Sequence, residues 1–261
     1  SGNILLRREQ YRRAESEPAS LPIAQNMIAA KLHNTRSLLQ RAARDHGTKS
    51  PERAHALTTT ADFLATRITA ATRATSLDSL RGTEGEAASA YFAAFNHLLT
   101  TDEPAFQLNG RSKRPPLDRT NALLSFLYVL LSHDCRSACE TVGLDPQSGF
   151  LHQPRPGRHS LALDLMEEFR PIFADRLALS LINRQQIRPE DFDIQQSGAV
   201  FLKEDSRKKV LTAWQERKQE SFHHPFIDEK ITYGLLPQIQ ARLLARHLRG
   251  DHDAYPAYLS R

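Results

Sequence analysis

The chain has 261 residues, of which 40% are apolar and 25% charged, and 35 Lys and Arg against 30 Asp and Glu give a formal net charge of +5. This balance excludes a disordered or a fibrous chain. The presence of only two cysteines excludes a disulfide-stapled secreted scaffold and favours a reducing cytoplasm. The longest apolar stretch, 122–131, is about half of what a bilayer requires, so no membrane span is expected.

Apolar residues recur at helical spacing through most of the chain, and this predicts an all-α fold. The predicted helices cover residues 22–45, 51–75, 83–100, 118–142, 160–183, 204–220 and 229–249. Asp118 and Gly143 are typical of the start and the end of the fourth helix. Pro237 should kink or split the last helix.

Few segments are expected to be extended. Residues 191–196 and 199–202 flank Ser197-Gly198, which favours a tight turn, so at most one short β-hairpin is predicted. Gly2–Leu6 is interpreted as the tail of a strand from an upstream element. His223-His224-Pro225 is expected to be a solvated turn at the end of a charged helix.

The segment 149–170 carries the most informative residues. On its predicted helix, Asp164 and Glu167 project from one face beside the apolar stripe. Two carboxylates near a core are costly unless a cation lies between them, and that cation could be a divalent metal or an arginine such as Arg158. His152 on the preceding loop adds an imidazole, which suits Mg²⁺ or Mn²⁺ better than a structural zinc. Taken alone, the segment favours a surface acid pair with a satisfied loop histidine.

A third acid, Glu84, lies beside small residues. Gly85 and Ala87 would let another helix approach closely and let the carboxylate point inward. The alternative is that Glu84 and Glu86 are first-turn acids that complement the helix dipole. The residues alone leave both interpretations open.

Other signals are weaker. His133-Asp134 is similar to the dipeptide of all-helical metal phosphohydrolases, but the same dipeptide recurs at His252-Asp253. Cys135 and Cys139 are expected to be buried apolar groups rather than ligands. Positive charge around a metal site suits a phosphodiester substrate. The basic residues that flank the acidic segments are Arg111, Lys113, Arg114, Arg155 and Arg158.

Several of these segments form one ordered set. Its members are 84–88 with 91–92, 118–126 with 128, 143–146, 149–152 and 160–171, and the opening 2–8 and closing 255–259 belong with them. In this order and spacing they resemble a known family, the CRISPR-associated integrase/endonuclease of the spacer-acquisition machinery that is the first in the Cas numbering. The resemblance covers nearly the whole chain.

The resemblance implies a catalytic site on an α-helical lobe. The residues that it assigns to catalysis are Glu84, His152, Glu167 and Asp164, of which the first three would hold Mg²⁺ or Mn²⁺ and the last would be an accessory carboxylate. Asn121 and Tyr128 would line the pocket. The residues expected to contact DNA are Lys113, Arg114, Arg155 and Arg158.

The resemblance also implies a reaction. The enzyme would insert foreign DNA fragments into a CRISPR array, by attack of a 3′-hydroxyl on a phosphodiester, in the cytoplasm of a prokaryote. Its partners would be a small Cas protein and double-stranded or branched DNA, and water in place of the 3′-hydroxyl would make it a nuclease. The alternatives are a non-catalytic helical DNA-binding or scaffold protein and a phosphohydrolase centred on His133-Asp134.

Family members begin with a β-rich domain that mediates homodimerisation. This chain begins without an initiator Met, and we interpret it as a fragment that starts at the end of that domain. Residues 1–10 would then be a remnant or linker and residues 11–261 the α-helical catalytic domain. The homodimer of the full-length protein would be weakened or lost.

Overall fold

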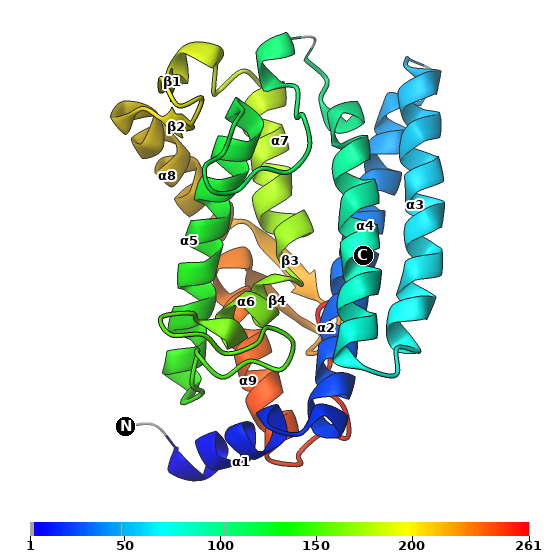
Figure 1. Ribbon diagram of the computed structural model, residues 1–261, viewed down its shortest axis with the longest axis vertical. Coiled ribbons are helices and arrows are strands. Elements are labelled where there is room, and N and C mark those ends of the chain that lie inside the picture. The colour runs from blue at the N-terminus through cyan, green and yellow to red at the C-terminus, as the bar shows by residue number, and fades with distance from the viewer. Residues whose placement is uncertain (1–2, 48, 102, 261) are drawn as a thin grey trace.

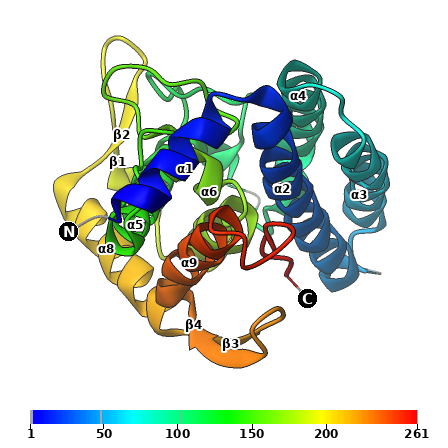
Figure 2. The ribbon, with the colours of Figure 1, turned by 90° about the horizontal axis from the view of Figure 1, so that it is seen from below.

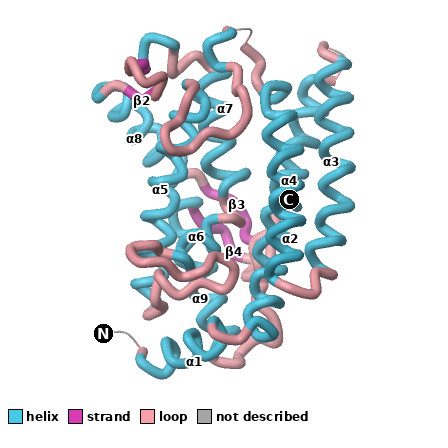
Figure 3. The backbone as a smooth tube through the Cα atoms, viewed as in Figure 1, coloured by secondary structure: helices cyan, strands magenta, loops and turns pink. Residues whose placement is uncertain are grey.

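A computed structural model describes residues 3–47, 49–101 and 103–260 and confirms the all-α class (Figure 1 and Figure 3). Its α-helices are α1 (Ile4–Ala14), α2 (Glu17–His46), α3 (Pro51–Thr72), α4 (Leu77–Ala94), α5 (Arg119–Val142), α6 (Ser160–Met166), α7 (Arg176–Asn183), α8 (Glu204–Gln219) and α9 (Leu236–Leu248). Two antiparallel pairs are formed by β1 (Phe192–Ile194) with β2 (Val200–Leu202) and by β3 (Ser221–His224) with β4 (Glu229–Thr232). Among the described residues, no helix has both the length and the apolar character to cross a membrane.

The helices stand in two groups. On one side, α2, α3 and α4 lie side by side, and on the other α5 packs against α6 and α9 (Figure 1). Helix α1 crosses the lower end of the molecule beside α2 and α9 (Figure 2). The polypeptide that joins α5 to α6 therefore lies near the junction between the two groups.

The core follows the helical spacing of the apolar residues. In α5, Leu123, Leu127 and Leu131 recur every four residues and are fully buried. Burying each such side chain stabilises the fold by roughly 1.5–3 kcal/mol. Both predicted ends of this helix are confirmed, because the Asp118 side chain accepts a hydrogen bond from the Asn121 amide at 2.7 Å and Gly143 adopts a left-handed φ of 88°.

Other predicted boundaries shift. Helix α2 begins at Glu17 and α4 at Leu77, ahead of the predicted starts at 22 and 83, and α4 ends at Ala94 with a short 3₁₀ turn after it. Ser76 explains the early start of α4, since its hydroxyl accepts a hydrogen bond from the Ser79 amide at 3.1 Å.

The predicted strand tail at Gly2–Leu6 is wrong in its described part. Asn3 caps α1 instead, because its side chain accepts hydrogen bonds from the Leu5 and Leu6 amides at 3.2 and 3.3 Å, while Gly2 lies outside the described residues. Helix α1 runs across the predicted boundary at residue 10. Gln10 is fully buried and donates to the backbone carbonyls of Asp145 and Ser148, each at 2.8 Å.

The start of the predicted helix 229–249 is also wrong. Residues 229–232 form β4, which pairs with β3 and adds a second hairpin to the predicted one. Helix α9 begins at Leu236, so Pro237 occupies its first turn, where a missing N–H has no cost, and neither kinks nor splits it. His224 is fully buried in β3 and does not belong to a solvated turn.

The predicted helix 160–183 is interrupted. Helix α6 ends at Met166, and a π-helical segment, Arg170–Asp175, precedes α7. Pro171 lies at this interruption, and it lacks the N–H that a continuous α-helix would use to bond the Glu167 carbonyl. The interruption places Glu167 at the C-terminal end of α6.

The C-terminal tail is held against Glu168, the residue that follows Glu167. Glu168 is fully buried and accepts hydrogen bonds from the Tyr255 hydroxyl at 2.6 Å and the Tyr258 amide at 2.7 Å. Burial raises the pKa of Glu168 to about 7, although these donors and Gln240 lower it. The Asn34 amide donates to the carbonyls of Glu168 and Tyr258 at 2.8 and 2.9 Å and so ties α2 to the tail.

Candidate functional site

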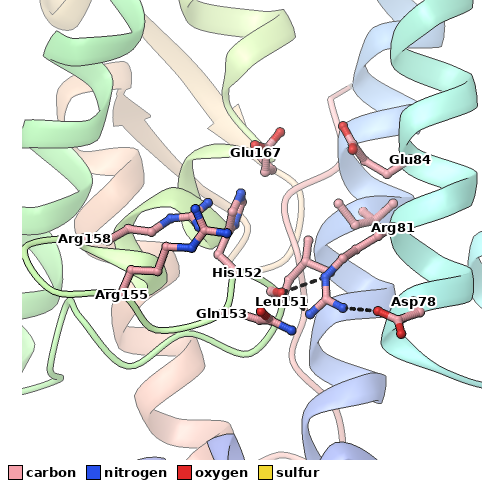
Figure 4. A pocket seen from close by; sticks show the side chains of 10 residues that line it. Asp78, Arg81, Glu84, Leu151, His152, Gln153, Arg155, Arg158 and Glu167 are labelled. Carbon is pink, nitrogen blue, oxygen red and sulfur yellow. Dashed lines mark hydrogen bonds and ion pairs between the residues drawn. The ribbon is translucent and has the colours of Figure 1, made fainter.

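A pocket of about 410 Å³ opens between α2, α4 and the loop before α6 (Figure 4). Its lining residues are Ile28, Asp78, Arg81, Glu84, Leu151, His152, Gln153, Arg155, Arg158 and Glu167. Three stretches of chain that lie far apart in sequence, in α2, in α4 and in the segment 151–167, thus meet here. They bring together the three predicted metal ligands and two of the four residues predicted to contact DNA.

Helix α4 presents Glu84 to this pocket. Leu80 and Ala87, one turn before and after it, are buried against the neighbouring helices and fix the rotation of α4. A Cβ atom at Gly85 would meet nothing within 4 Å. The expectation that Gly85 permits a close helix approach is therefore wrong, and the packing of Leu80 and Ala87 positions the carboxylate.

Lys31 of α2 lies between the two facing carboxylates. Its ammonium group donates to Glu167 Oε2 at 2.7 Å and also to Glu84 Oε1. The sequence predicted a cation between Asp164 and Glu167, either a divalent metal or an arginine such as Arg158, and not a lysine between Glu84 and Glu167. Lys31 was missed, although it continues the apolar face of α2 that includes Met27 and Ile28, and a lysine at such a position needs an acidic partner.

Glu167 is held from its other side by Arg170. The Arg170 Nη1 atom donates to both carboxylate oxygens, at 2.7 and 2.9 Å, and the guanidinium group stacks 4.3 Å from the centre of the Tyr128 ring. Burial alone would raise the pKa of Glu167, but Arg170 and Lys31 hold that pKa well below its usual range. Burial alone would lower the pKa of Lys31, but the carboxylates of Glu167 and Glu84 raise it above its ordinary value. The cluster is therefore ionised.

Asp164 positions His152. It is fully buried on α6 and accepts backbone hydrogen bonds from Phe150 at 2.6 Å, Leu151 at 3.0 Å and His152 at 2.9 Å. Its Oδ1 is also 2.6 Å from His152 Nδ1, which must carry the proton because a carboxylate only accepts. In the neutral imidazole this leaves the lone pair on Nε2, and the ring lies in the pocket near Glu167 (Figure 4).

Gly149 allows this arrangement. A Cβ atom there would lie 2.6 Å from Asp164 Oδ2 and 2.8 Å from the Ser160 carbonyl carbon, closer than unbonded atoms approach. A glycine is therefore required for the loop to lie against α6. No local pattern in the sequence reveals this requirement, because the close contact is with residues of the next element, α6.

The donor set suits a hard divalent cation. Two carboxylates and one imidazole are ligands for Mg²⁺ or Mn²⁺, and a carboxylate behind a metal-binding histidine is the usual supporting partner. As the side chains stand, however, the described residues contain no group of three His, Cys, Asp or Glu close enough together to hold a metal ion. Glu84, His152 and Glu167 fit in kind and line one pocket, and the Lys31 ammonium lies between the carboxylates.

A smaller pocket of about 60 Å³ adjoins the first. Lys113, Tyr128 and Arg170 are among the residues that line it, together with Glu84 and Lys31. Lys113 thus lines the adjoining pocket, whereas Arg155 and Arg158 line the larger one. Arg114 is exposed and lines neither of these two pockets.

Asn121, predicted to line the pocket, is not among the lining residues of either one. Its side chain is fully buried, accepts from Arg111 Nη1 at 2.6 Å and donates to the Gly110 carbonyl at 2.8 Å. It therefore shapes the basic loop that carries Lys113. Tyr128 donates its hydroxyl proton to buried Asp175 at 2.6 Å.

The residues of the phosphohydrolase alternative have structural roles. His133 is exposed, and Asp134 accepts hydrogen bonds from Trp214 at 3.2 Å and Lys218 at 2.9 Å, which tie α8 to α5. Cys135 and Cys139 are free and buried, as predicted.

Fold and pocket together define an all-α protein whose site combines carboxylates, an imidazole and guanidinium groups, a composition suited to a metal ion and a phosphate-bearing ligand. The family model described as CRISPR associated protein Cas1 matches residues 1–216. The chain belongs to the Cas1 family, and the resemblance read from the sequence is confirmed.

Relatives with similar sequences and solved structures with a similar fold also carry the Cas1 name. The "CRISPR-associated endonuclease Cas1 2" of Rhodospirillum rubrum is 55% identical, and the "CRISPR-associated endonuclease Cas1 1" of Chlorobaculum tepidum 53%; they match 99% and 100% of this chain, which spans 75% of each. The structure of a CAS1 protein from Thermotoga maritima matches this chain with a TM-score of 0.80 at 25% identity. The match covers 100% of this chain and 74% of the Thermotoga chain. A chain of a Cas6-RT-Cas1–Cas2 complex matches with a TM-score of 0.83 at 26% identity. This match covers 99% of the present chain and 27% of the chain in the complex.

Proposed function

We propose that the protein is a metal-dependent DNA endonuclease and integrase that inserts foreign DNA fragments into a CRISPR array. The meeting of Glu84, His152 and Glu167 on one pocket rimmed by guanidinium groups carries the proposal. The names of the relatives, which are CRISPR-associated endonucleases, support nuclease chemistry. Inserting a fragment requires attack of its 3′-hydroxyl on a phosphodiester, and water in its place gives cleavage.

The chain's residues have distinct tasks in this reaction. Glu84, Glu167 and Nε2 of His152 would hold Mg²⁺ or Mn²⁺, which supplies a Lewis acid for the phosphoryl oxygen. Asp164 is a positioning residue, because it fixes the tautomer and orientation of His152 without lining the pocket. Arg170 keeps Glu167 ionised and oriented.

DNA would cross the pocket between two basic borders. Arg155 and Arg158 reach the pocket from the loop before α6 (Figure 4), and Lys113 reaches the adjoining one. Phosphates on both sides of the scissile bond can thus be held while the carboxylates remain at the centre. Arg114 remains a proposed contact that is exposed on the same loop as Lys113.

The proposal includes partners. The similarity to a chain of a solved Cas6-RT-Cas1–Cas2 complex supports a small Cas protein as one of them. Double-stranded and branched DNA are the proposed substrates, in a prokaryotic cytoplasm, and the longer protein is proposed to form a homodimer through a preceding β-rich domain. Residues 11–261 would form the catalytic domain, with α1 packed onto it.

The test is strand transfer and cleavage of branched DNA in Mn²⁺ by purified variants. We expect Glu84→Gln and His152→Ala each to lower the rate by at least about 100-fold, because each removes one ligand at a site of charge development. Glu86→Gln is the matched control, since Glu86 lies on the same helix but pairs with Arg67 on the surface. Its rate should stay within about threefold of the unmodified protein.

Circular dichroism and melting temperature would show that each variant is folded. A Glu84→Gln variant that keeps its rate would remove Glu84 from the site. If the unmodified protein binds DNA without a metal and does not cleave it in Mn²⁺, the result would instead favour the non-catalytic scaffold.

A further inference from the structure

We propose that Lys31 is a built-in cation that occupies the place between Glu84 and Glu167 in the metal-free protein and leaves it when a divalent metal enters. The inference rests on the proposed function, since it concerns the same site. It assigns to Lys31 a role in metal exchange that the donor set alone does not require.

The contacts of Lys31 are those of a substitute cation. Its ammonium group reaches one oxygen of each carboxylate, and only 11% of its side-chain surface is exposed. Without it, two carboxylates would face each other across a poorly solvated gap. A bound cation lowers that repulsion, and the protein supplies one from α2.

Charge balance explains why the ammonium must leave. Lys31 and Arg170 carry two positive charges, and Glu84 and Glu167 carry two negative ones, so the metal-free cluster is neutral. A divalent ion added to this cluster would leave two uncompensated positive charges in a largely buried site. Moving the ammonium out halves that excess and frees the carboxylate oxygens for the metal.

The other cation cannot serve as the mobile one. Arg170 donates to both oxygens of Glu167 and is stacked on Tyr128, whose hydroxyl is held by Asp175. In the described part of the chain, the Lys31 ammonium has no hydrogen-bond partner besides the two carboxylates. Lys31 is thus held only through the end of a flexible, unbranched side chain, whereas the guanidinium group of Arg170 is fixed by Glu167 and by the Tyr128 ring.

If a divalent metal replaces the Lys31 ammonium, then removing that ammonium should strengthen metal binding. Mn²⁺ affinity would be measured without DNA, from the electron paramagnetic resonance signal of the free ion, for the unmodified protein, Lys31→Met and Lys113→Met. We expect Lys31→Met to bind Mn²⁺ more tightly by about tenfold or more, because no competing state must be displaced. Lys113→Met removes the same charge from the adjoining pocket, and its affinity should change by less than about threefold.

A second measurement needs no variant. Acetylation of lysines, read by mass spectrometry with and without Mn²⁺, should show Lys31 slow to react in the metal-free protein and several-fold faster with the ion, while Lys208 on α8 does not change. Equal or weaker Mn²⁺ affinity of Lys31→Met, or a Lys31 reactivity that Mn²⁺ leaves unchanged, would overturn the exchange. If the unmodified protein and Lys31→Met both fail to bind Mn²⁺, the metal dependence of the proposed function fails as well.

Discussion

Gly149 shows how much of the site depends on single atoms. The space that a Cβ would need is filled by Asp164 and Ser160, which hold the loop that carries His152. The backbone at Gly149 is otherwise ordinary, so the constraint is one of space and not of dihedral angle. Any side chain at this position must push the loop away from α6.

Gly149→Ala should therefore lower both stability and activity. Overpacking typically costs about 1–3 kcal/mol, which urea unfolding would detect. Gly82→Ala is the matched control, since a Cβ at Gly82 in α4 meets nothing within 4 Å and alanine favours the helix. A Gly149→Ala variant as stable and active as the control would mean that the loop does not need this contact.

The ligand candidates could be named from sequence, but the cations could not. Glu84, His152 and Glu167 belong to short motifs, and the structure brings them to one pocket, while their metal-binding role stays a prediction. Lys31 lies in a helix that carried no motif, and Arg170 follows Glu167 across a helix break that periodicity did not reveal. Their roles depend on tertiary contacts, which no local pattern contains.

At the scale of elements, long helices with caps were predictable and the irregular joints were not. Helix α5 has a capping Asp118 and a terminal Gly143, so its limits could be read directly. The segment 160–183 gives no sign of its break, because residues 171–175 of the π-helical part are all buried and no change of face marks the interruption. The second hairpin was missed because four-residue strands carry too little alternation to be distinguished from a helix start.

The docking of the C-terminal tail on Glu168 should make stability depend on pH. The folded-state pKa of about 7 lies above the ordinary value of 4.5, so the folded protein binds more protons between these pH values. Its contribution to stability is fully present below about pH 4.5 and is lost as pH rises toward 7, by about 3 kcal/mol in total.

Urea unfolding at pH 5 and pH 8 would measure this effect. The loss of stability between these pH values should be smaller in Glu168→Gln than in the unmodified protein, whereas exposed Glu86→Gln should behave like the unmodified protein. A Glu168→Gln variant with an unchanged or steeper loss would contradict the assignment of a raised pKa to this carboxyl.

For the whole molecule, the distribution of charge matters more than its net value of +5. Arg155 and Arg158 border the pocket, and no ion pair with an acidic group of the described residues neutralises either of them. They are therefore available to phosphates. Lys208, in contrast, lies on α8 beside Glu204 and Asp205.

Replacing Arg155 and Arg158 by Ala should weaken binding to DNA of any sequence. Each lost phosphate contact lowers the slope of log affinity against log salt by about 0.9, so the double variant should lose between about 1 and 2 units. Fluorescence anisotropy between low and physiological salt would measure the slope, and Lys208→Ala should keep it. An unchanged slope in the double variant would place the DNA path elsewhere.

Hydrogen bonds from α1 to the segment 143–148 join two parts of the chain that lie far apart in sequence. The Gln10 side chain holds two carbonyls and the Asp145 amide there, and Arg7 holds the Gly143 carbonyl at 3.1 Å. His152 follows only four residues after the last of these anchors. A change in the position of α1 would therefore act on the loop that carries His152 through only a short length of backbone.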